Sequence, residues 1–169
     1  MNQDNRPELS EAFLKAYDDL GDAIFKHCYF RVYDREQARD LVQECFTRTW
    51  EQLAAGKEIH NIKAFLYRVA NNLVIDRARK KKESSLDEAL EQGFQPAGTE
   101  NAETAAEVGQ ALRALERLDP KYREAVRLRY IDGLSPGEIA AVTGESENNV
   151  SVRVHRGLEQ LRQALRAGA

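Results

Sequence analysis

The sequence has few of the residues and motifs from which catalytic and metal sites are built. Its 169 residues include two cysteines and three histidines, and none of them shows a CxxC or Cys/His ligand spacing. We find no GxxxxGK[ST] phosphate loop and no recognisable pairing of a nucleophile with a base. These absences argue against an enzyme and against a bound metal or other cofactor. Cys28 and Cys45 fall at apolar positions of helical patterns, and we expect both to be buried thiols.

Long apolar runs and strand signals are also missing. No apolar run approaches the roughly 20 residues that a membrane-spanning helix needs, and the polar, acidic start MNQDNRPELSE does not resemble a secretory leader. We therefore expect a cytoplasmic protein without membrane insertion. Period-2 alternation and hairpin dipeptides are nearly absent, whereas helical periodicity runs through most of the chain. The predicted fold class is all-α.

The net charge of −3 conceals a sharp reversal along the chain. Residues 63–82 carry a net charge of +6, and residues 83–107 carry −7 without a single basic residue. Such a reversal is unusual for a plain enzyme. Gly, Pro, Ser and acids dominate the acidic segment, which predicts a flexible linker, with a short helical turn at most. Two small helical modules, residues 8–82 and 108–167, are expected on either side of it.

The first module has the periodicity of three helices. The first helix, near residues 8–32, places Phe13, Tyr17, Ile24 and Cys28 among the apolar residues of one side. The second begins at Asp34, where Asp34 and Gln37 form a capping-box pattern. The third, from Ile62 to Lys82, is the strongest amphipathic segment of the chain.

The second module contains two helical segments separated by a glycine. Ser135 and Glu138 form a capping box at the start of a short helix, and Gly144 suits a left-handed turn after it. Ser146 can then cap a longer helix. That helix packs through residues spaced four, four, three and four: Val150, Val154, Leu158, Leu161 and Leu165. A short capped helix, a glycine turn and a longer helix are typical of a helix-turn-helix.

The longer helix carries polar and basic residues away from its apolar stripe. They are Asn148, Asn149, Ser151, Arg153 and Arg156. Asn pairs with adenine edges, Arg with guanine or phosphate, and Ser with several bases. A solvated face on a packing helix is the alternative, but the helix-turn-helix context favours DNA recognition. The neighbouring His155 has no partner at ligand spacing, which favours a surface position over a metal site.

Three stretches in this order carry a resemblance to a known family. They are ARDLVQECFTRTWE (38–51), AFLYRVANNLVIDRARKKK (64–82) and LERLDPKYREAVRLRYIDGLSPGEIAAVTGESENNVSVRVHRGLEQLR (115–162). Together they resemble a bacterial RNA polymerase sigma factor of the extracytoplasmic-function group, which has only regions two and four. The resemblance implies that region two recognises and melts the minus-ten promoter element and that region four recognises the minus-thirty-five element.

The resemblance also implies a role for DLVQE in the second helix. The family uses this face to grip the polymerase's largest subunit, so Asp40, Gln43 and Glu44 are expected to bind core polymerase. Without the resemblance, an exposed acidic helix face would be the interpretation.

For the third helix, the resemblance implies contact with the minus-ten element through amides and basic side chains. These are Arg68, Asn71, Asn72, Arg77, Arg79 and Lys80. Asp76 precedes two of the cations by three and four residues and is expected to orient them. The family captures a flipped base in the loop before this helix, here Ala55–Asn61. Tyr67 and Trp50 are candidates for stacking on DNA, although Trp50 also continues an apolar side and fits the core.

We therefore predict a promoter-specificity subunit whose partners are core RNA polymerase, promoter DNA and an anti-sigma factor. The alternative is a stand-alone helix-turn-helix regulator. Such a regulator would not need the basic third helix, and it would normally supply a dimerisation surface, which the sequence does not reveal. The free chain is accordingly expected to be a monomer.

Overall fold

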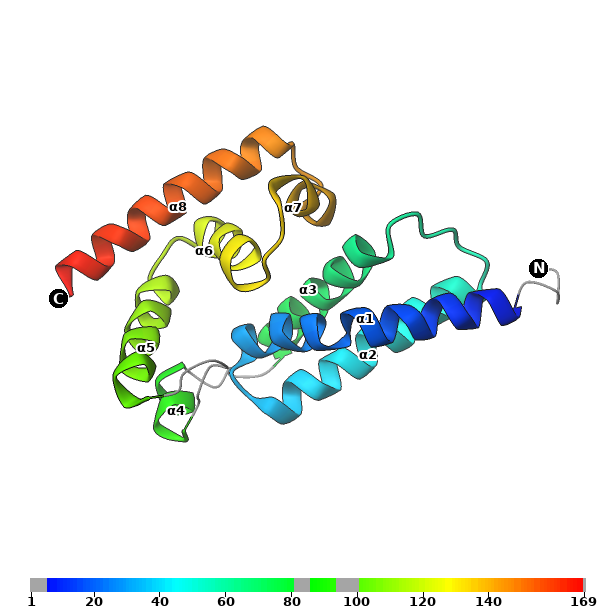
Figure 1. Cartoon of the computed structure of the whole chain (residues 1–169), viewed down its shortest axis with the longest axis horizontal. Helices are drawn as coiled ribbons and strands as arrows, with labels where there is room; N and C mark the ends of the chain where they lie inside the picture. The colour runs from blue at the N-terminus through cyan, green and yellow to red at the C-terminus, as the bar shows by residue number, and fades with distance from the viewer. Residues whose placement is uncertain (1–5, 81–85, 94–100, 169) are drawn as a thin grey trace. The chain divides into compact units, whose positions relative to one another are not determined.

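The computed structural model describes residues 6–80, 86–93 and 101–168, which are helical throughout apart from short connections (Figure 1). No strand occurs in these ranges, and the predicted all-α class is confirmed. The chain divides into two compact units, residues 1–83 and 84–169.

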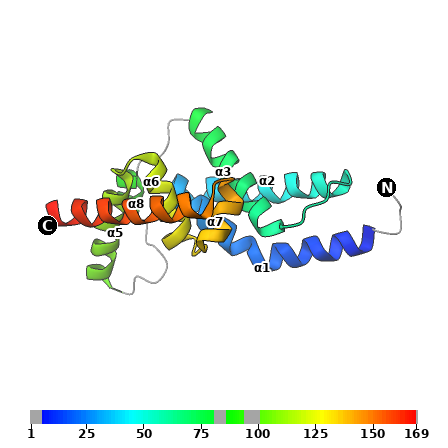
Figure 2. The same ribbon diagram turned by 90° about the horizontal axis from the view of Figure 1, so that it is seen from above.

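Unit 1 is a bundle of three helices. They are α1 (Arg6–Val32), α2 (Arg35–Ala54) and α3 (Ile62–Lys80). α1 and α2 run antiparallel, and α3 crosses both (Figures 1 and 2). The core consists of fully or almost fully buried apolar side chains contributed by all three helices, which include Ile24, Cys28, Leu41, Cys45, Leu66 and Ala70. The apolar stripes of the sequence therefore meet in one core.

Polar side chains fix the points at which α2 and α3 begin. The Asp34 carboxylate accepts a hydrogen bond from the backbone N–H of Gln37 at 2.9 Å, and the Gln37 side-chain amide donates back to the same carboxylate at 3.2 Å. The predicted cap at Asp34 is confirmed. The Gln37 side chain takes part in it by donating a hydrogen bond to the Asp34 carboxylate. At the start of α3, Asn61 Oδ1 accepts from the Ala64 N–H at 3.0 Å. Each cap satisfies an N–H group that the helix leaves unpaired.

Both cysteines of unit 1 are buried and unbridged, as expected. Cys45 Sγ lies 3.4 Å from the Leu66 carbonyl oxygen, to which it donates a weak hydrogen bond. Burial raises the pKa of the Cys45 thiol from 9.0 to about 12. The thiolate is the reactive form of cysteine, so Cys45 is chemically inert near neutral pH.

Unit 2 contains five α-helices and one π-helical turn within the residues that the structure describes. They are α4 (Leu86–Glu91), α5 (Ala102–Glu116), α6 (Pro120–Val126), a π-helical turn at Arg127–Ile131, α7 (Pro136–Thr143) and α8 (Glu147–Ala167). α8 packs on α5, α6 and α7. Asp119 caps α6 and Pro120 occupies its first turn, where the missing N–H of proline is not needed.

The structure differs from the sequence prediction in the acidic segment 83–107. α5 begins at Ala102, where the Asn101 side chain accepts a hydrogen bond from the Thr104 N–H at 2.8 Å. The prediction of a linker that continues to Glu107 is therefore wrong from Ala102 onward, because this cap and the alanines that follow it favour a helix. Within the same segment, α4 is helical over six residues. Residues 83–85 and 94–100 lie outside the described residues.

Candidate nucleic-acid and partner interfaces

The helix-turn-helix predicted in unit 2 is present with its caps. The Ser135 N–H donates to Glu138 Oε2 at 2.8 Å, and the Glu138 N–H donates to Ser135 Oγ at 3.2 Å. Gly144 adopts φ +76°, the left-handed conformation that turns the chain into α8. Ser146 Oγ accepts from the Asn149 N–H at 3.2 Å and caps α8. The geometry of α7, turn and α8 follows the sequence prediction.

α8 is anchored to the rest of unit 2 at its N-terminal half. Val150 is 2% exposed and packs into the core, as predicted. The predicted stripe residues further along, from Val154 to Leu165, are only half-buried. A close crossing with α6 occurs at the buried Gly157, where an added Cβ would lie 2.7 Å from Val126 Cγ2 and 3.0 Å from the Tyr122 carbonyl oxygen. A glycine inside a long helix lowers the stability of the helix by about 1 kcal/mol relative to alanine. The presence of glycine at this position is the only feature of the sequence that indicates the contact.

The polar side chains predicted to read DNA share one end of α8. Asn148, Asn149, Ser151 and Arg156 are exposed, whereas Arg153 is half-buried. The Arg153 guanidinium forms an ion pair with Glu145 Oε1 at 2.5 Å. Glu145 lies in the turn before α8, and its other carboxylate oxygen is buried without a hydrogen-bond partner in the described residues. One of the two predicted base-reading arginines is thus held by an internal carboxylate.

α3 presents a second set of amide and basic side chains. Arg68, Asn72, Arg79 and Lys80 are exposed, and Asn71 and Arg77 are half-buried. This helix therefore offers amide readers together with phosphate-binding charge on unit 1.

Two aromatic side chains were considered for stacking on DNA. Tyr67 is 1% exposed and packs edge-on against His27 in the core. A stacking role for Tyr67 is wrong, because a side chain buried to this degree cannot reach a DNA base. Trp50 is half-buried with its ring centroid 5.2 Å from that of Phe13, which agrees with its interpretation as an apolar packing residue.

A charged groove of about 320 Å³ joins the polar face of α2 to the basic end of α3. Asp40 and Glu44 line one side of it, and Arg77 and Lys80 line the other. Glu44 forms an ion pair with Arg48 at 2.5 Å. The structure thus brings two of the predicted polymerase-binding carboxylates next to two of the predicted DNA-binding cations.

Asp76 lies in the wall of this groove, together with Arg77 and Lys80. We expected its carboxylate to orient Arg79 and Lys80, but the structure forms no ion pair between Asp76 and either cation, both of which lie in the described range. The orienting role expected for Asp76 therefore finds no support among the contacts of these described residues.

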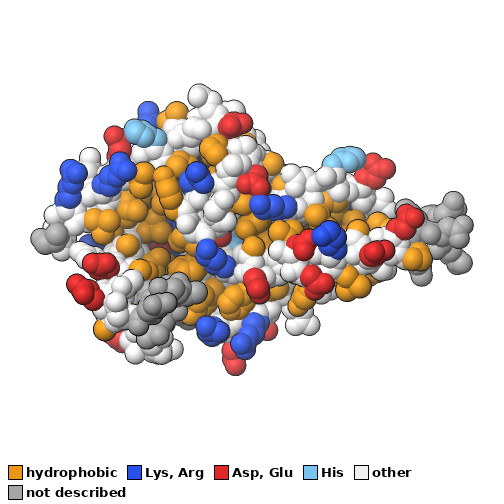
Figure 3. All heavy atoms as spheres, viewed as in Figure 1, with side chains coloured by type: hydrophobic (Ala, Val, Ile, Leu, Met, Phe, Trp, Pro, Cys, Tyr) orange, Lys and Arg blue, Asp and Glu red, His pale blue; other side chains and the backbone are white. Residues whose placement is uncertain are grey.

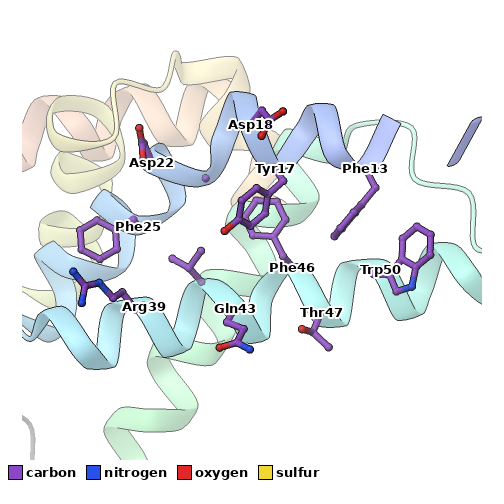
Figure 4. Close-up of a pocket in the computed structure, with 12 residues that line it drawn as sticks. Phe13, Tyr17, Asp18, Asp22, Phe25, Arg39, Gln43, Phe46, Thr47 and Trp50 are labelled. Carbon is purple, nitrogen blue, oxygen red and sulfur yellow. The ribbon is translucent and has the colours of Figure 1, made fainter. Parts of the chain in front are cut away.

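A larger groove, of about 790 Å³, runs between α1 and α2 (Figure 4). Aromatic side chains line it, and Asp18, Asp22, Arg39 and Gln43 stand around them; the aromatic residues are Phe13, Tyr17, Phe25, Phe46 and Trp50. Tyr17 remains 50% exposed. Carboxylates are spread along α1 between patches of apolar surface (Figure 3). Helical periodicity places these aromatic residues on apolar stripes. It does not indicate that the packing of α1 against α2 leaves them partly uncovered.

Other kinds of site find no support in the described ranges. No group of three or more His, Cys, Asp or Glu side chains is placed to hold a metal ion. No helix there combines the length and the apolar character needed to cross a bilayer. The described residues thus present two polar surfaces, one on α3 of unit 1 and one on α8 of unit 2, together with the aromatic groove between α1 and α2.

A helix-turn-helix on one unit and a basic helix beside an acidic face on the other are features of the class of helical DNA-binding proteins built from two units. Family models agree with this division: the sigma-70 region 2 model matches residues 10–84, and the sigma-70 region 4 model matches residues 108–161. The chain is 32% identical to the ECF RNA polymerase sigma factor SigW of Bacillus subtilis (strain 168), over 92% of this chain and 90% of that protein.

Solved structures of similar fold agree. CnrH in complex with the cytosolic domain of CnrY matches with a TM-score of 0.69 and 26% identity, over 95% of this chain and 91% of that one. The sigma factor RpoE from Bartonella quintana, in complex with the anti-sigma factor NepR, shares the fold with a TM-score of 0.71 and 22% identity, over 92% of this chain and 98% of that one. The chain belongs to the extracytoplasmic-function sigma factors, which are transcription initiation factors of RNA polymerase.

Proposed function

We propose that this chain binds core RNA polymerase, carries it to promoters that contain two separated elements and helps to open them. The observation that carries the proposal is the presence, in one chain of this family, of two separately folded units with different DNA-compatible surfaces. The protein contributes recognition and binding energy, and the polymerase performs the chemistry. We place this activity in the cytoplasm, where RNA polymerase acts.

The polymerase-binding surface is centred on Asp40, Gln43 and Glu44 of α2. Asp40 and Gln43 are exposed, and the Glu44 side chain is 41% exposed beside Arg48. Gln43 also lines the aromatic groove. A helix of the polymerase with basic and apolar side chains would complement this surface, because it could pair with the carboxylates and cover the exposed aromatic rings.

The minus-ten element is read by α3, and the minus-thirty-five element is read by α8. On α3, the exposed Asn72 suits a base edge, and Arg79 and Lys80 suit phosphates. On α8, Asn148, Asn149 and Arg156 lie at the N-terminal half, which is the part of a recognition helix that meets base edges. A stand-alone regulator would use α8 alone and would leave the surfaces of unit 1 without a role.

We also infer that an anti-sigma factor binds this chain. Two solved structures of similar fold are complexes: CnrH with the cytosolic domain of CnrY, and the sigma factor RpoE with the anti-sigma factor NepR. The support for this chain is the aromatic groove of unit 1, whose exposed Tyr17 and acidic rim need cover from a partner.

The polymerase surface is tested by replacing two carboxylates. Asp40→Ala with Glu44→Ala should weaken binding to core polymerase about tenfold or more, while circular dichroism and thermal unfolding stay near wild type. The matched control is Glu36→Ala with Glu51→Ala, which removes two exposed carboxylates from the same helix outside both grooves. Equal affinity of the two double variants for core polymerase would contradict the assignment of this surface.

A further inference from the structure

Three valines occupy alternate positions near the start of α8, in the stretch VSVRV (150–154). Successive residues of an α-helix are about 100° apart around its axis, so Val152 points about 160° away from both Val150 and Val154. Val150 is buried and Val154 is half-buried, whereas Val152 is 40% exposed. The packing of α8 on the rest of unit 2 therefore accounts for two of these valines and leaves Val152 without a role in the core.

Val152 lies in the middle of the polar face of α8. Asn148 precedes it by four residues and Arg156 follows it by four, so each is about 40° away around the helix and about 6 Å away along it. Both of these side chains are exposed, and both are predicted to contact DNA. An apolar side chain thus stands between two predicted DNA contacts, in the N-terminal half of the recognition helix.

The backbone and the side chain of Val152 are both restrained. Val150, two residues earlier, is 2% exposed, and Gly157, five residues later, packs closely against α6. A valine in a helix has one strongly preferred χ1 rotamer. Its two methyl groups are therefore presented in a fixed direction, without the loss of side-chain freedom that a longer residue would undergo on binding.

A thymine base has the chemistry that suits an isolated apolar side chain on this face. A single valine among polar side chains offers far less surface than the roughly 800 Å² that each partner buries in a standard protein–protein interface. In the major groove, thymine presents a C5-methyl group, which apolar side chains contact, together with its O4 acceptor. Contact between the valine and this methyl group removes water from two apolar surfaces at once.

We propose that Val152 selects thymine at one position of the minus-thirty-five element by packing against the C5-methyl group of that base. This inference rests on the proposed function, in which α8 reads the minus-thirty-five element. Asn148 and Arg156 then address neighbouring base pairs, because the rise of about 6 Å from Val152 to each of them approaches two base-pair steps of about 3.4 Å.

Replacement of thymine by deoxyuridine tests the contact, because it removes only the methyl group and keeps the hydrogen-bonding groups of the base. A promoter is first found by mapping the 5′ ends of transcripts made by core polymerase with the full-length protein. Each thymine of its minus-thirty-five element, on either strand, is then replaced in turn, and binding of the duplex to the holoenzyme is measured. One replacement should weaken binding of the wild-type holoenzyme about fourfold, as expected for one buried methyl group. The holoenzyme with Val152→Ala should bind that duplex and the thymine duplex with equal affinity.

Two controls separate this role from a structural one. Thermal unfolding of Val152→Ala should be no easier than that of wild type, because the position is exposed and alanine favours a helix more than valine does. Ile75→Ala removes a β-branched side chain that is 43% exposed on α3 of unit 1, and it should keep the wild-type sensitivity to deoxyuridine in the minus-thirty-five element.

Three results would overturn the thymine contact. They are an element without thymine, an element in which no replacement weakens binding of the wild-type holoenzyme, and equal weakening of the wild-type and Val152→Ala holoenzymes. Absence of promoter-dependent transcription with the wild-type protein would instead contradict the proposed function, so the two failures are distinguishable.

Discussion

The two predicted DNA-binding helices differ in how their basic side chains are held. On α3, Arg79 and Lys80 are exposed, and no ion pair links them to another described residue. On α8, Arg153 is bound to Glu145 at 2.5 Å and is only half-exposed. If the predicted roles hold, the α3 surface would meet phosphates without breaking an internal contact, whereas Arg153 would have to leave the Glu145 carboxylate to contact DNA. A carboxylate partner within the protein weakens the non-specific attraction of an arginine to DNA phosphates. It favours DNA sites whose acceptor groups can replace that carboxylate.

The two units also differ in how tightly their helices approach. Gly21 in α1 has no atom within 4 Å of an added Cβ, whereas Gly157 in α8 would bring its Cβ within 2.7 Å of Val126. Unit 1 keeps a wide aromatic groove between α1 and α2, and unit 2 closes the crossing of α6 with α8. An open surface suits a protein partner, and a closed crossing suits a rigid recognition helix.

The largest predicted effect comes from filling that crossing. Gly157→Ala should destabilise unit 2 by about 1–3 kcal/mol, because the new methyl group meets the backbone of α6. Gly21→Ala is the matched control, and it should stabilise unit 1 by roughly 0.5–1 kcal/mol, because nothing obstructs it and alanine favours a helix. Denaturant unfolding measures both changes. Stability of Gly157→Ala equal to that of wild type would show that the crossing of α6 with α8 has room for a methyl group.

Next come the two arginines of α8. Either Arg153→Ala or Arg156→Ala should reduce promoter-dependent transcription, by about 1–3 kcal/mol of binding if the lost contact joins a base. Arg153→Ala should in addition lower the stability of unit 2, because it leaves the partly buried Glu145 without its partner. Thermal unfolding of the two variants separates these effects. Equal stability of both variants would show that the ion pair does not contribute to the fold.

A smaller effect is expected from removing the carboxylate. Glu145→Gln releases Arg153 while it keeps the size of the side chain. Because a solvent-accessible ion pair is worth about 0.2–1 kcal/mol, binding of the holoenzyme to promoter duplex should tighten by about fivefold at most. Filter binding at several salt concentrations would measure this gain. Weaker binding would show that Glu145 positions Arg153 and does not restrain it.

The smallest effect near neutral pH concerns Cys45. Its folded pKa is raised from 9.0 to about 12, so folding favours the protonated thiol. The corresponding stability is fully present below about pH 9 and is lost as the pH rises toward 12. Unit 2 has no cysteine and lacks this contribution. Cys45→Ala, compared with wild type by unfolding at pH 8 and pH 10.5, should reduce the pH dependence of unit 1; an unchanged slope would argue against it.

Much of the fold was predictable because it follows local rules. Helical periodicity, the cap at Asp34 and the capping box of Ser135 with Glu138 depend on neighbours within four residues. What the sequence missed depends on distant contacts. The sequence indicates no more than a short helical turn where the six-residue helix α4 packs on α5, and the crossing at Gly157 involves residues about thirty positions apart. The aromatic groove arises because α1 and α2 diverge, which no periodicity reveals. The roles of the individual DNA-facing residues remain predictions.

One experiment tests the central claim most directly. Core polymerase is mixed with fragmented genomic DNA, with and without the purified protein, and the 5′ ends of the transcripts are mapped. The account predicts new start sites that appear only when the protein is present and that share two upstream elements at fixed spacing, while the free protein binds these sites weakly. No new start sites, together with tight sequence-specific binding by the free protein, would contradict the account and favour a stand-alone regulator.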